Sequence, residues 1–108
     1  MTPRRGDVWW VHLDPATGSE IGKTSPCLVV GANVVNQRRR TVVVVPLSSS
    51  PLASPPLLVP LHCAGQPAVA VVDQIRAVSK QRLHRKMGTL SSEHLEAVEN
   101  ALRQILEL

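Results

Sequence analysis

The segment from Thr41 to Leu47 constrains the fold of this chain most strongly, because it contains four consecutive valines, Val42 to Val45. A β-branched side chain is stiff at its first torsion angle and packs well on a pleated surface, so such a run favours a strand. The same bias extends through all 108 residues, of which 44% are hydrophobic although none is Phe or Tyr. A chain of this length fits a single domain, residues 1–108, built mainly of strands.

Further strands are expected on both sides of this segment. Asp7 to Leu13 alternates two sets of side chains and places Trp9 and Trp10 on opposite faces of a strand. Apolar runs bounded by Gly, Pro or polar residues predict further strands over 26–33, 57–61 and 68–72, the last continuing through 75–77. The remaining segments are polar or rich in Pro, Gly and Ser, and they predict a loop over 14–25, a turn over 36–40 and an exposed loop over 48–56.

Two helices are expected after these strands. Ser79 can cap a short helix through Leu83, and Gly88 ends that segment. Ser91 can cap a final helix, whose apolar side chains recur at three-to-four spacing in one stripe: Leu95, Val98, Leu102, Ile105 and Leu106. About five strands followed by two helices, without βαβ alternation, predict a small antiparallel barrel or half-open sheet with helices packed on one side.

Charge and cysteine usage narrow the possible functions only partly. The net charge of +4 raises the local concentration of polyanions, but it fits a merely basic soluble protein equally well. Cys27 and Cys63 form no CxxC pair and have no His at metal-ligand spacing, so we expect free thiols in a reducing cytosol and no metal site. The first residues precede no apolar signal segment and no run approaches about 20 apolar residues, which predicts a cytoplasmic protein without a membrane span.

Several short motifs, taken in chain order, resemble the MazF/PemK family of toxin endoribonucleases over nearly the whole chain. Arg5 to Trp10 with Leu13-Asp14-Pro15 resembles the family's first strand and turn. Gly18-Ser19-Glu20 and Pro26 to Val30 resemble its signature loop and second strand. The later motifs are Val44 to Ser49, Asp73 to Arg76, Ser79 to Leu83, and Gly88 with Leu90 before a terminal helix.

This resemblance implies a fold, an activity and partners. The fold is a mainly β, SH3-like barrel with a C-terminal helix, shared by MazF, PemK and CcdB toxins. The protein is expected to be the homodimeric toxin of a type II toxin–antitoxin system, an mRNA interferase that cleaves single-stranded RNA at a short sequence. Neither a metal nor a cofactor is expected. A MazE-like antitoxin is expected to neutralise it by laying a flexible tail across the RNA groove.

Metal-free RNA cleavage requires deprotonation of the 2′-hydroxyl, protonation of the leaving 5′-oxygen and stabilisation of the charge on the phosphorane. In the family, a Thr or Ser at the end of the third strand hydrogen-bonds the scissile phosphate, and Ser48 matches that position. The alternative for Ser48 is that it merely begins a serine-rich loop. Glu20 matches an acidic position of the signature loop, where it acts as a base or orients a cation, or else pairs with Lys23 on the surface.

Ser25 marks a departure from the family pattern, which places an arginine immediately before the proline of the second strand. A serine cannot supply that permanent, bidentate charge, and losing one such donor commonly costs on the order of a hundred- to a thousandfold in rate. Three explanations remain open. The chain is an inactivated form, it is a paralogue without catalysis, or a neighbour such as Lys23 contacts the phosphate instead.

The remaining candidate site residues are expected to bind RNA, with a structural alternative for each. Asp73 matches a family position that contacts a base or orients a catalytic group, but a buried Asp that ties down a loop explains it equally well. The basic run from Arg38 to Arg40 is usually a solvated turn, although it can contact phosphates. The expected RNA-binding residues are Ser19, Lys23, Ser49, Asp73, Gln74 and Arg76.

Two non-catalytic functions compete with the ribonuclease hypothesis. One is an inactive paralogue that only binds antitoxin. The other is a gyrase poison of the CcdB type, which shares the fold and inserts its C-terminal residues into its partner. Here the segment from Gln104 to Leu108 resembles the end of an amphipathic helix more than a tail suited to insertion.

Overall fold

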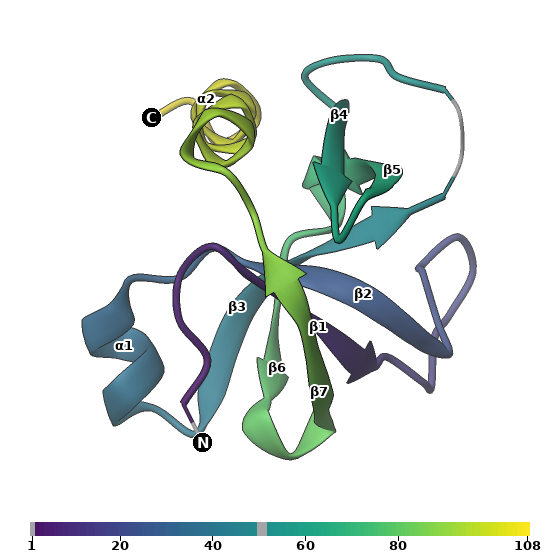
Figure 1. Ribbon diagram of the computed structural model, residues 1–108. Coiled ribbons are helices and arrows are strands. Elements are labelled where there is room, and N and C mark those ends of the chain that lie inside the picture. Colours follow the sequence, from purple (N-terminus) through teal and green to yellow (C-terminus); the bar gives the residue numbers. More distant parts are fainter. Residues whose placement is uncertain (1, 50–51) are drawn as a thin grey trace.

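The fold, known from a computed structural model that describes residues 2–49 and 52–108, is centred on strand β3 (Thr41–Ser48). The described residues form a seven-stranded sheet in which every pairing is antiparallel, and it curls strongly around its own axis (Figure 1). Its strands follow the order β4-β5-β3-β2-β1-β7, and β6 also pairs with β3. The other strands are β1 (Asp7–His12), β2 (Thr24–Val29), β4 (Leu58–Cys63), β5 (Gln66–Val71), β6 (Arg76–Ser79) and β7 (Leu83–Thr89).

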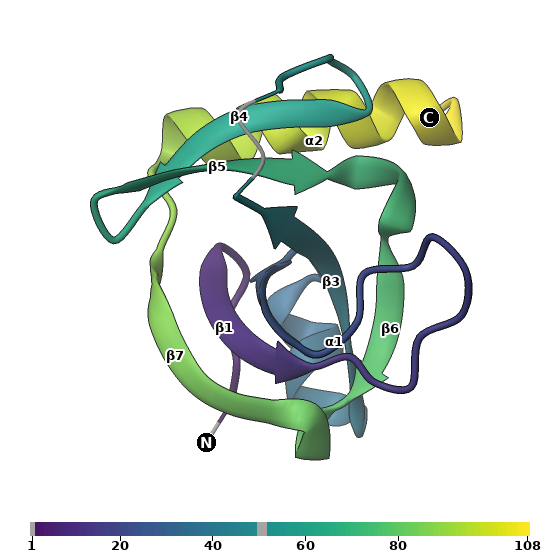
Figure 2. The same cartoon turned by 90° about the vertical axis from the view of Figure 1, so that its right-hand side faces the viewer.

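Strand β3 uses one of its edges for two different partners. Its first half, Thr41 to Val44, pairs with β6, and its last two residues pair with β5. Pro46 lies between these two pairings, opposite Cys27 on the other edge. A proline has no N–H to donate to a ladder, and here it occupies the point where the edge changes partner. The change of partner lets the sheet bend sharply, as Figure 2 shows.

Side-chain alternation along β3 divides the interior into two cores. Val42 and Val44 pack with Trp9 and the inner residues of β1 and β2. Val45 and Leu47 point to the opposite face and pack with β4, β5 and helix α2 (Ser92–Leu106). The strand is therefore buried on both faces, which explains why its sequence is continuously apolar rather than alternating.

Helix α2 covers the second core, and its cap agrees with the sequence prediction. The Ser91 hydroxyl accepts a hydrogen bond from the His94 N–H at 3.2 Å. Val98 and Ala101 are buried, but Leu106, which was predicted in the apolar stripe, is 48% exposed. Within the described residues, no helix is long and apolar enough to cross a membrane.

The structure corrects the predictions for the segment between β2 and β3. Residues 26–33 were predicted as one strand and 36–40 as a turn, but β2 ends at Val29 and a short helix, α1 (Asn33–Arg38), follows. The Asn36 side chain is fully buried and its amide donates to the Gly31 carbonyl at 3.0 Å. This bond and the burial of Asn36 stabilise a helix whose Val and Asn residues have weak intrinsic helix propensity.

The segment after β5 also differs from its prediction. The strand predicted through 75–77 is interrupted by a 3-10 turn at Val72–Gln74, so β5 and β6 are separate strands. The Ser79 hydroxyl accepts from the Gln81 N–H as a cap would, but the turn it caps ends at Arg82 and strand β7 follows. The predicted class, a mainly β antiparallel barrel with a C-terminal helix, is confirmed with more strands than expected. Part of the predicted loop over 48–56 lies outside the described residues.

Changing Asn36 to Asp tests the contact that holds α1. The substitution replaces the amide donor with an oxygen that faces the Gly31 carbonyl, and it buries a carboxylate whose other oxygen, at the position of Asn36 Oδ1, has no hydrogen-bond partner. We expect a loss of about 3–5 kcal/mol in the free energy of unfolding at pH 7, measured by urea titration. The loss should shrink at acidic pH, where the new carboxyl is neutral.

Gln37→Glu is the matched control, because the same amide-to-carboxylate change then falls on an exposed neighbour. It should alter the free energy of unfolding by no more than about 0.5 kcal/mol. Equal losses for the two variants would show that burial of Asn36 is not what matters.

Candidate functional site

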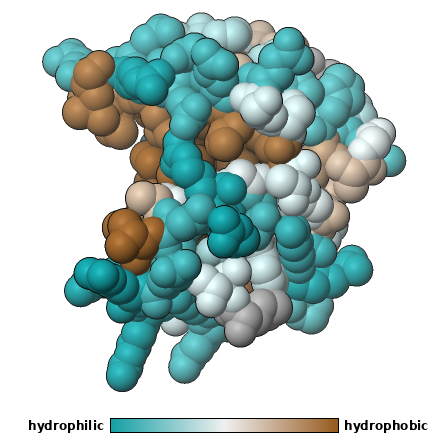
Figure 3. Space-filling model, turned by 60° about the vertical axis from the view of Figure 1, so that its left-hand side comes forward, coloured by the Kyte–Doolittle hydropathy of each residue, from teal (hydrophilic) through white to brown (hydrophobic). Residues whose placement is uncertain are grey.

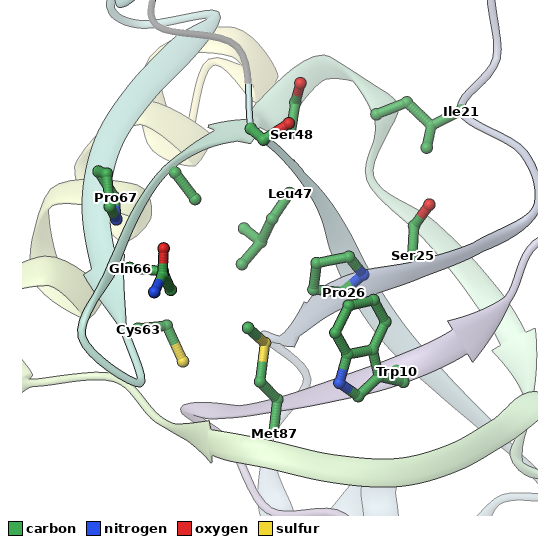
Figure 4. A pocket seen from close by; sticks show the side chains of 12 residues that line it. Trp10, Ile21, Ser25, Pro26, Leu47, Ser48, Cys63, Gln66, Pro67 and Met87 are labelled. Carbon is green, nitrogen blue, oxygen red and sulfur yellow. The ribbon is translucent and has the colours of Figure 1, made fainter.

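A pocket of about 500 Å³ opens between the β4–β5 hairpin and the curled sheet (Figure 4). Its wall is mostly apolar, with a few hydroxyl and amide groups among the apolar side chains. Pockets of this kind, apolar with a small number of polar groups, are typical of ligand sites. The residues that line it are Trp10, Ile21, Ser25, Pro26, Leu47, Ser48, Ser49, Cys63, Gln66, Pro67, Ala68 and Met87.

Trp10 forms part of one wall of this pocket and lies between Pro26 and Arg85 on the neighbouring strands. The guanidinium carbon of Arg85 lies 5.8 Å from the centroid of the Trp10 ring. This distance is within the range of a cation–π contact, which keeps a permanent positive charge beside the pocket. Trp9 is 3% exposed and belongs to the core, so the prediction that the two tryptophans lie on opposite faces is confirmed.

Three serine side chains share the pocket wall. Ser25 lies on β2, Ser48 ends β3, and Ser49 follows it. Ser25 is partly buried, and its hydroxyl donates to the Gly22 carbonyl at 3.0 Å. The structure thus brings the predicted Ser25, Ser48 and Ser49 together, although they come from two different strands.

A second, smaller depression of about 340 Å³ adjoins the first, and Ile21 lines both. It collects four of the predicted site residues: Glu20, Asp73, Gln74 and Arg76. Asp73 is exposed, so the alternative of a buried aspartate is wrong. The two depressions together therefore form a candidate site with hydroxyls in one half and charged groups in the other.

The loop between β1 and β2 is held by side chains that bond to its backbone. Gln74 accepts from the Ile21 N–H at 2.8 Å and donates to the Ser19 carbonyl at 3.3 Å. Arg82 donates to the carbonyls of His12 and Asp14, at 3.0 and 2.5 Å. These bonds fix the path of the loop between the two depressions without using its own side chains.

Two carboxylates inside the loop add local bonds. Asp14 accepts from the Lys23 N–H at 2.6 Å, and Glu20 accepts from the Thr17 N–H at 2.8 Å. The alternative of a Glu20–Lys23 ion pair is not found among the ion pairs of residues 2–49 and 52–108. Lys23 is exposed and lines neither depression, and the same holds for Ser19.

The sequence did not single out the wall contributed by β4, β5 and β7. Cys63, Gln66 and Pro67 come from the β4–β5 hairpin, and Met87 comes from β7. Simple alternation along β7 would not have identified this wall, because the β1–β7 register shifts twice and Leu83 packs into the core around Trp9.

Both thiols are free and buried, as predicted for a chain without a disulfide. Burial raises the pKa of the Cys27 thiol to about 12, while the Arg76 charge acts in the opposite direction. Burial also raises the pKa of the Cys63 thiol, which lies at the pocket wall. Both thiols therefore stay protonated near neutral pH and are poor nucleophiles. No group of His, Cys, Asp and Glu in the described part of the chain could hold a metal ion.

Comparison with known proteins shows the family. Residues 4–106 match the family of PemK-like, MazF-like toxins of type II toxin–antitoxin systems. The chain is 35% identical to the endoribonuclease MazF9 of Mycobacterium tuberculosis, with 97% of each protein covered. It is 32% identical to the endoribonuclease EndoA of Bacillus subtilis, covering 100% of this chain and 97% of that protein.

Solved structures agree on the fold. Crystalline MazF of Deinococcus radiodurans superposes with a TM-score of 0.88 at 23% identity, covering 100% of this chain and 99% of that one. An endoribonuclease from a Mycobacterial species, solved in complex with its cognate antitoxin, superposes with a TM-score of 0.80 at 23% identity, covering 99% and 95%. The chain belongs to the PemK-like, MazF-like toxin family.

Gly22→Ala tests how tightly the β1–β2 loop is built. An added Cβ would lie 2.6 Å from Asp14 Oδ1 and 2.9 Å from the Ala16 Cβ, so the loop would have to shift. We expect faster proteolysis of the loop and faster exchange of the Leu13 and Lys23 amide protons, which bond within it.

Gly18→Ala is the control within the same loop. Nothing lies within 4 Å of its added Cβ, so only the strain of its φ of +61° remains, a cost of about 1 kcal/mol. Equal exchange rates in Gly22→Ala and the unmodified protein would show that the loop is loosely packed at this point.

Proposed function

We propose that this protein is the toxin of a type II toxin–antitoxin system and a metal-independent endoribonuclease that cleaves single-stranded RNA in this pocket. The observation that carries the proposal is the convergence of Ser25, Ser48 and Ser49 beside the Trp10 ring and the Arg85 charge. The two curated relatives are named endoribonucleases and match almost the full length of the chain, which supports the activity.

The serine hydroxyls of the larger pocket and the carboxylates of the smaller depression have different roles in the proposed reaction. The Ser48 hydroxyl donates to a phosphate oxygen at the end of β3 in this mechanism. Glu20 takes the proton of the 2′-hydroxyl or orients a cation, and Asp73 contacts a base or orients a reacting group. Ser25 contributes a neutral hydroxyl at the position where a fixed positive charge would do most to stabilise the phosphorane.

Two arginines are better placed than Lys23 to supply part of the missing charge. Arg85 lies on Trp10 beside the larger pocket, and Arg76 lines the smaller depression. Lys23 lines neither, so it contacts RNA only outside the pocket. We therefore infer that Arg85 and Arg76 stabilise the charge of the phosphorane from positions farther away than residue 25. Cleavage is then slower than it would be with an arginine at position 25.

The other candidate residues have one of two roles: some contact the RNA, and one holds the loop in place. Ser49, Asp73, Arg76 and Trp10 present groups to bound RNA, with the indole as a stacking surface. Gln74 supports these groups indirectly by holding Ser19 and the rest of the loop in place.

We also propose a cytoplasmic homodimer neutralised by a MazE-like antitoxin. Helix α1 carries the exposed Val34 and Val35, and helix α2 carries the exposed Leu106. Both helices lie toward the left of Figure 1, and this side is suited to a second copy. Figure 3 shows apolar side chains gathered in and beside a hollow on this side of the molecule. The similar Mycobacterial endoribonuclease, solved in complex with its cognate antitoxin, supports the second partner.

Ser25→Arg tests the proposal directly. It restores a bidentate cation at the pocket wall, so we expect cleavage of a long, labelled single-stranded RNA in EDTA to rise on the order of a hundred- to a thousandfold. Ser25→Gln is the control, because it adds a similar length of side chain without the charge and should leave the rate nearly unchanged. If neither the original chain nor Ser25→Arg cleaves any RNA, the ribonuclease proposal fails and an antitoxin-binding paralogue is favoured.

Arg85→Gln tests the charge beside Trp10. We expect the kcat/KM of the Ser25→Arg variant and the RNA affinity of the original chain both to fall about 10- to 100-fold, the effect of losing one charged hydrogen bond. Arg103→Gln removes an exposed charge on α2 and should change neither quantity. Equal effects of the two substitutions would exclude a specific contact by Arg85.

A further inference from the structure

A basic groove lies at the opposite end of β3 from the pocket. It has a volume of about 560 Å³, and its lining includes Arg38, Arg39, Arg40 and Lys80. A smaller depression of about 320 Å³, lined by the same three arginines and Thr41, adjoins it. None of these residues lines the candidate site, so the pocket chemistry does not account for the groove.

The backbone brings the charges of this groove together. Helix α1 ends at Arg38, and the chain turns at Arg39 and Arg40 into β3. On the other side, the Lys80 N–H donates to the Arg40 carbonyl at 2.9 Å, and Thr41 pairs with Ser79 in the β3–β6 ladder. The groove is therefore a fixed feature of the sheet edge.

No acidic side chain in the described part of the chain pairs with these charges. The ion pairs among those residues are Arg5–Glu99 and Lys86–Asp7, and neither involves the groove. No Asp or Glu is among the residues that line it. Four like charges on a small surface repel one another, and a bound polyanion would relieve that repulsion while releasing its counterions.

The rest of the lining favours phosphate over a protein segment. Beside the four cations the groove has the side chains of Gln37, Ser79 and Gln81, and its lining includes no apolar residue. A protein interface normally requires an apolar or aromatic anchor at its centre. Arg and Lys flanked by amide and hydroxyl donors are instead the groups that contact a nucleic-acid backbone.

The spacing along β3 suits one RNA strand that reaches both sites. Thr41 lines the basic depression and Ser48 lines the pocket, and seven residue steps of extended strand separate them by about 23 Å. We propose that the groove of Arg38, Arg39, Arg40 and Lys80 is a second RNA-binding site, which holds the phosphodiester backbone outside the cleaved segment. This inference depends on the proposed function, since the same RNA occupies both sites.

The test measures RNA affinity against salt concentration by fluorescence anisotropy, with one RNA of about 3 nucleotides, too short to reach both sites, and one of about 20. The variant is Arg39→Gln/Arg40→Gln, and the matched control is Arg4→Gln/Arg103→Gln, which removes the same charge from exposed positions elsewhere. For the long RNA we expect the slope of log affinity against log salt to shrink by about 0.7 for each phosphate that the variant no longer neutralises. The short RNA should bind the variant and the unmodified protein equally.

The other outcomes separate the two proposals. If the control loses as much affinity for the long RNA as the variant does, the effect is only net charge and the second site is excluded. If the variant loses affinity for an acidic peptide but keeps its affinity for RNA, a protein partner occupies the groove and the inference is wrong. If no form of the protein binds either RNA, the proposed function itself fails. Thermal unfolding confirms that each variant is folded.

Discussion

The burial of β3 on both faces is the constraint on which the rest of this structure depends. A strand covered on one face needs one core, but Val42 and Val44 pack into one core while Val45 and Leu47 pack into another. The sheet must therefore curl around the first core and accept helix α2 over the second. This arrangement leaves a gap where the β4–β5 hairpin separates from the curled sheet, and the pocket occupies it. The same strand has Ser48 at one end and the basic groove at the other. Its length therefore sets the distance between the pocket and the groove.

Local pattern was enough to predict the elements whose side chains repeat regularly. The valine run predicted β3, and the alternation of Trp9 and Trp10 predicted β1. The apolar stripe that follows the Ser91 cap predicted α2. Prediction failed where tertiary contacts decide the conformation. Helix α1 forms around the buried Asn36, and β7 forms because it pairs with β1 along most of its length, in spite of the His, Lys and Gly in its sequence.

The candidate site was predictable only in part, for a related reason. The motif resemblance selected Ser25, Ser48 and Ser49, and the structure places them on one wall. It also selected Gln74, but only the structure shows that both ends of this side chain bond to loop backbone. Arg85 and the hairpin wall depend on pairing between strands distant in sequence, and neither composition nor spacing encodes that pairing.

The hydrogen bonds that hold the β1–β2 loop affect which of its side chains can change in related toxins. Gln74 and Arg82 bond to backbone carbonyl and amide groups, which do not depend on side-chain identity except that proline has no N–H. Exposed side chains that take no part in the loop's own bonds can therefore change while these backbone bonds remain, whereas Gly22 and Asp14 are restricted by their close contact. The Lys23 side chain is exposed, although its backbone φ of 59° disfavours β-branched replacements, and Ser25 contributes one hydroxyl bond to Gly22. Exposed positions of this loop can therefore vary while the barrel stays folded. The groups that the chain presents beside the pocket can thus change while its fold stays the same.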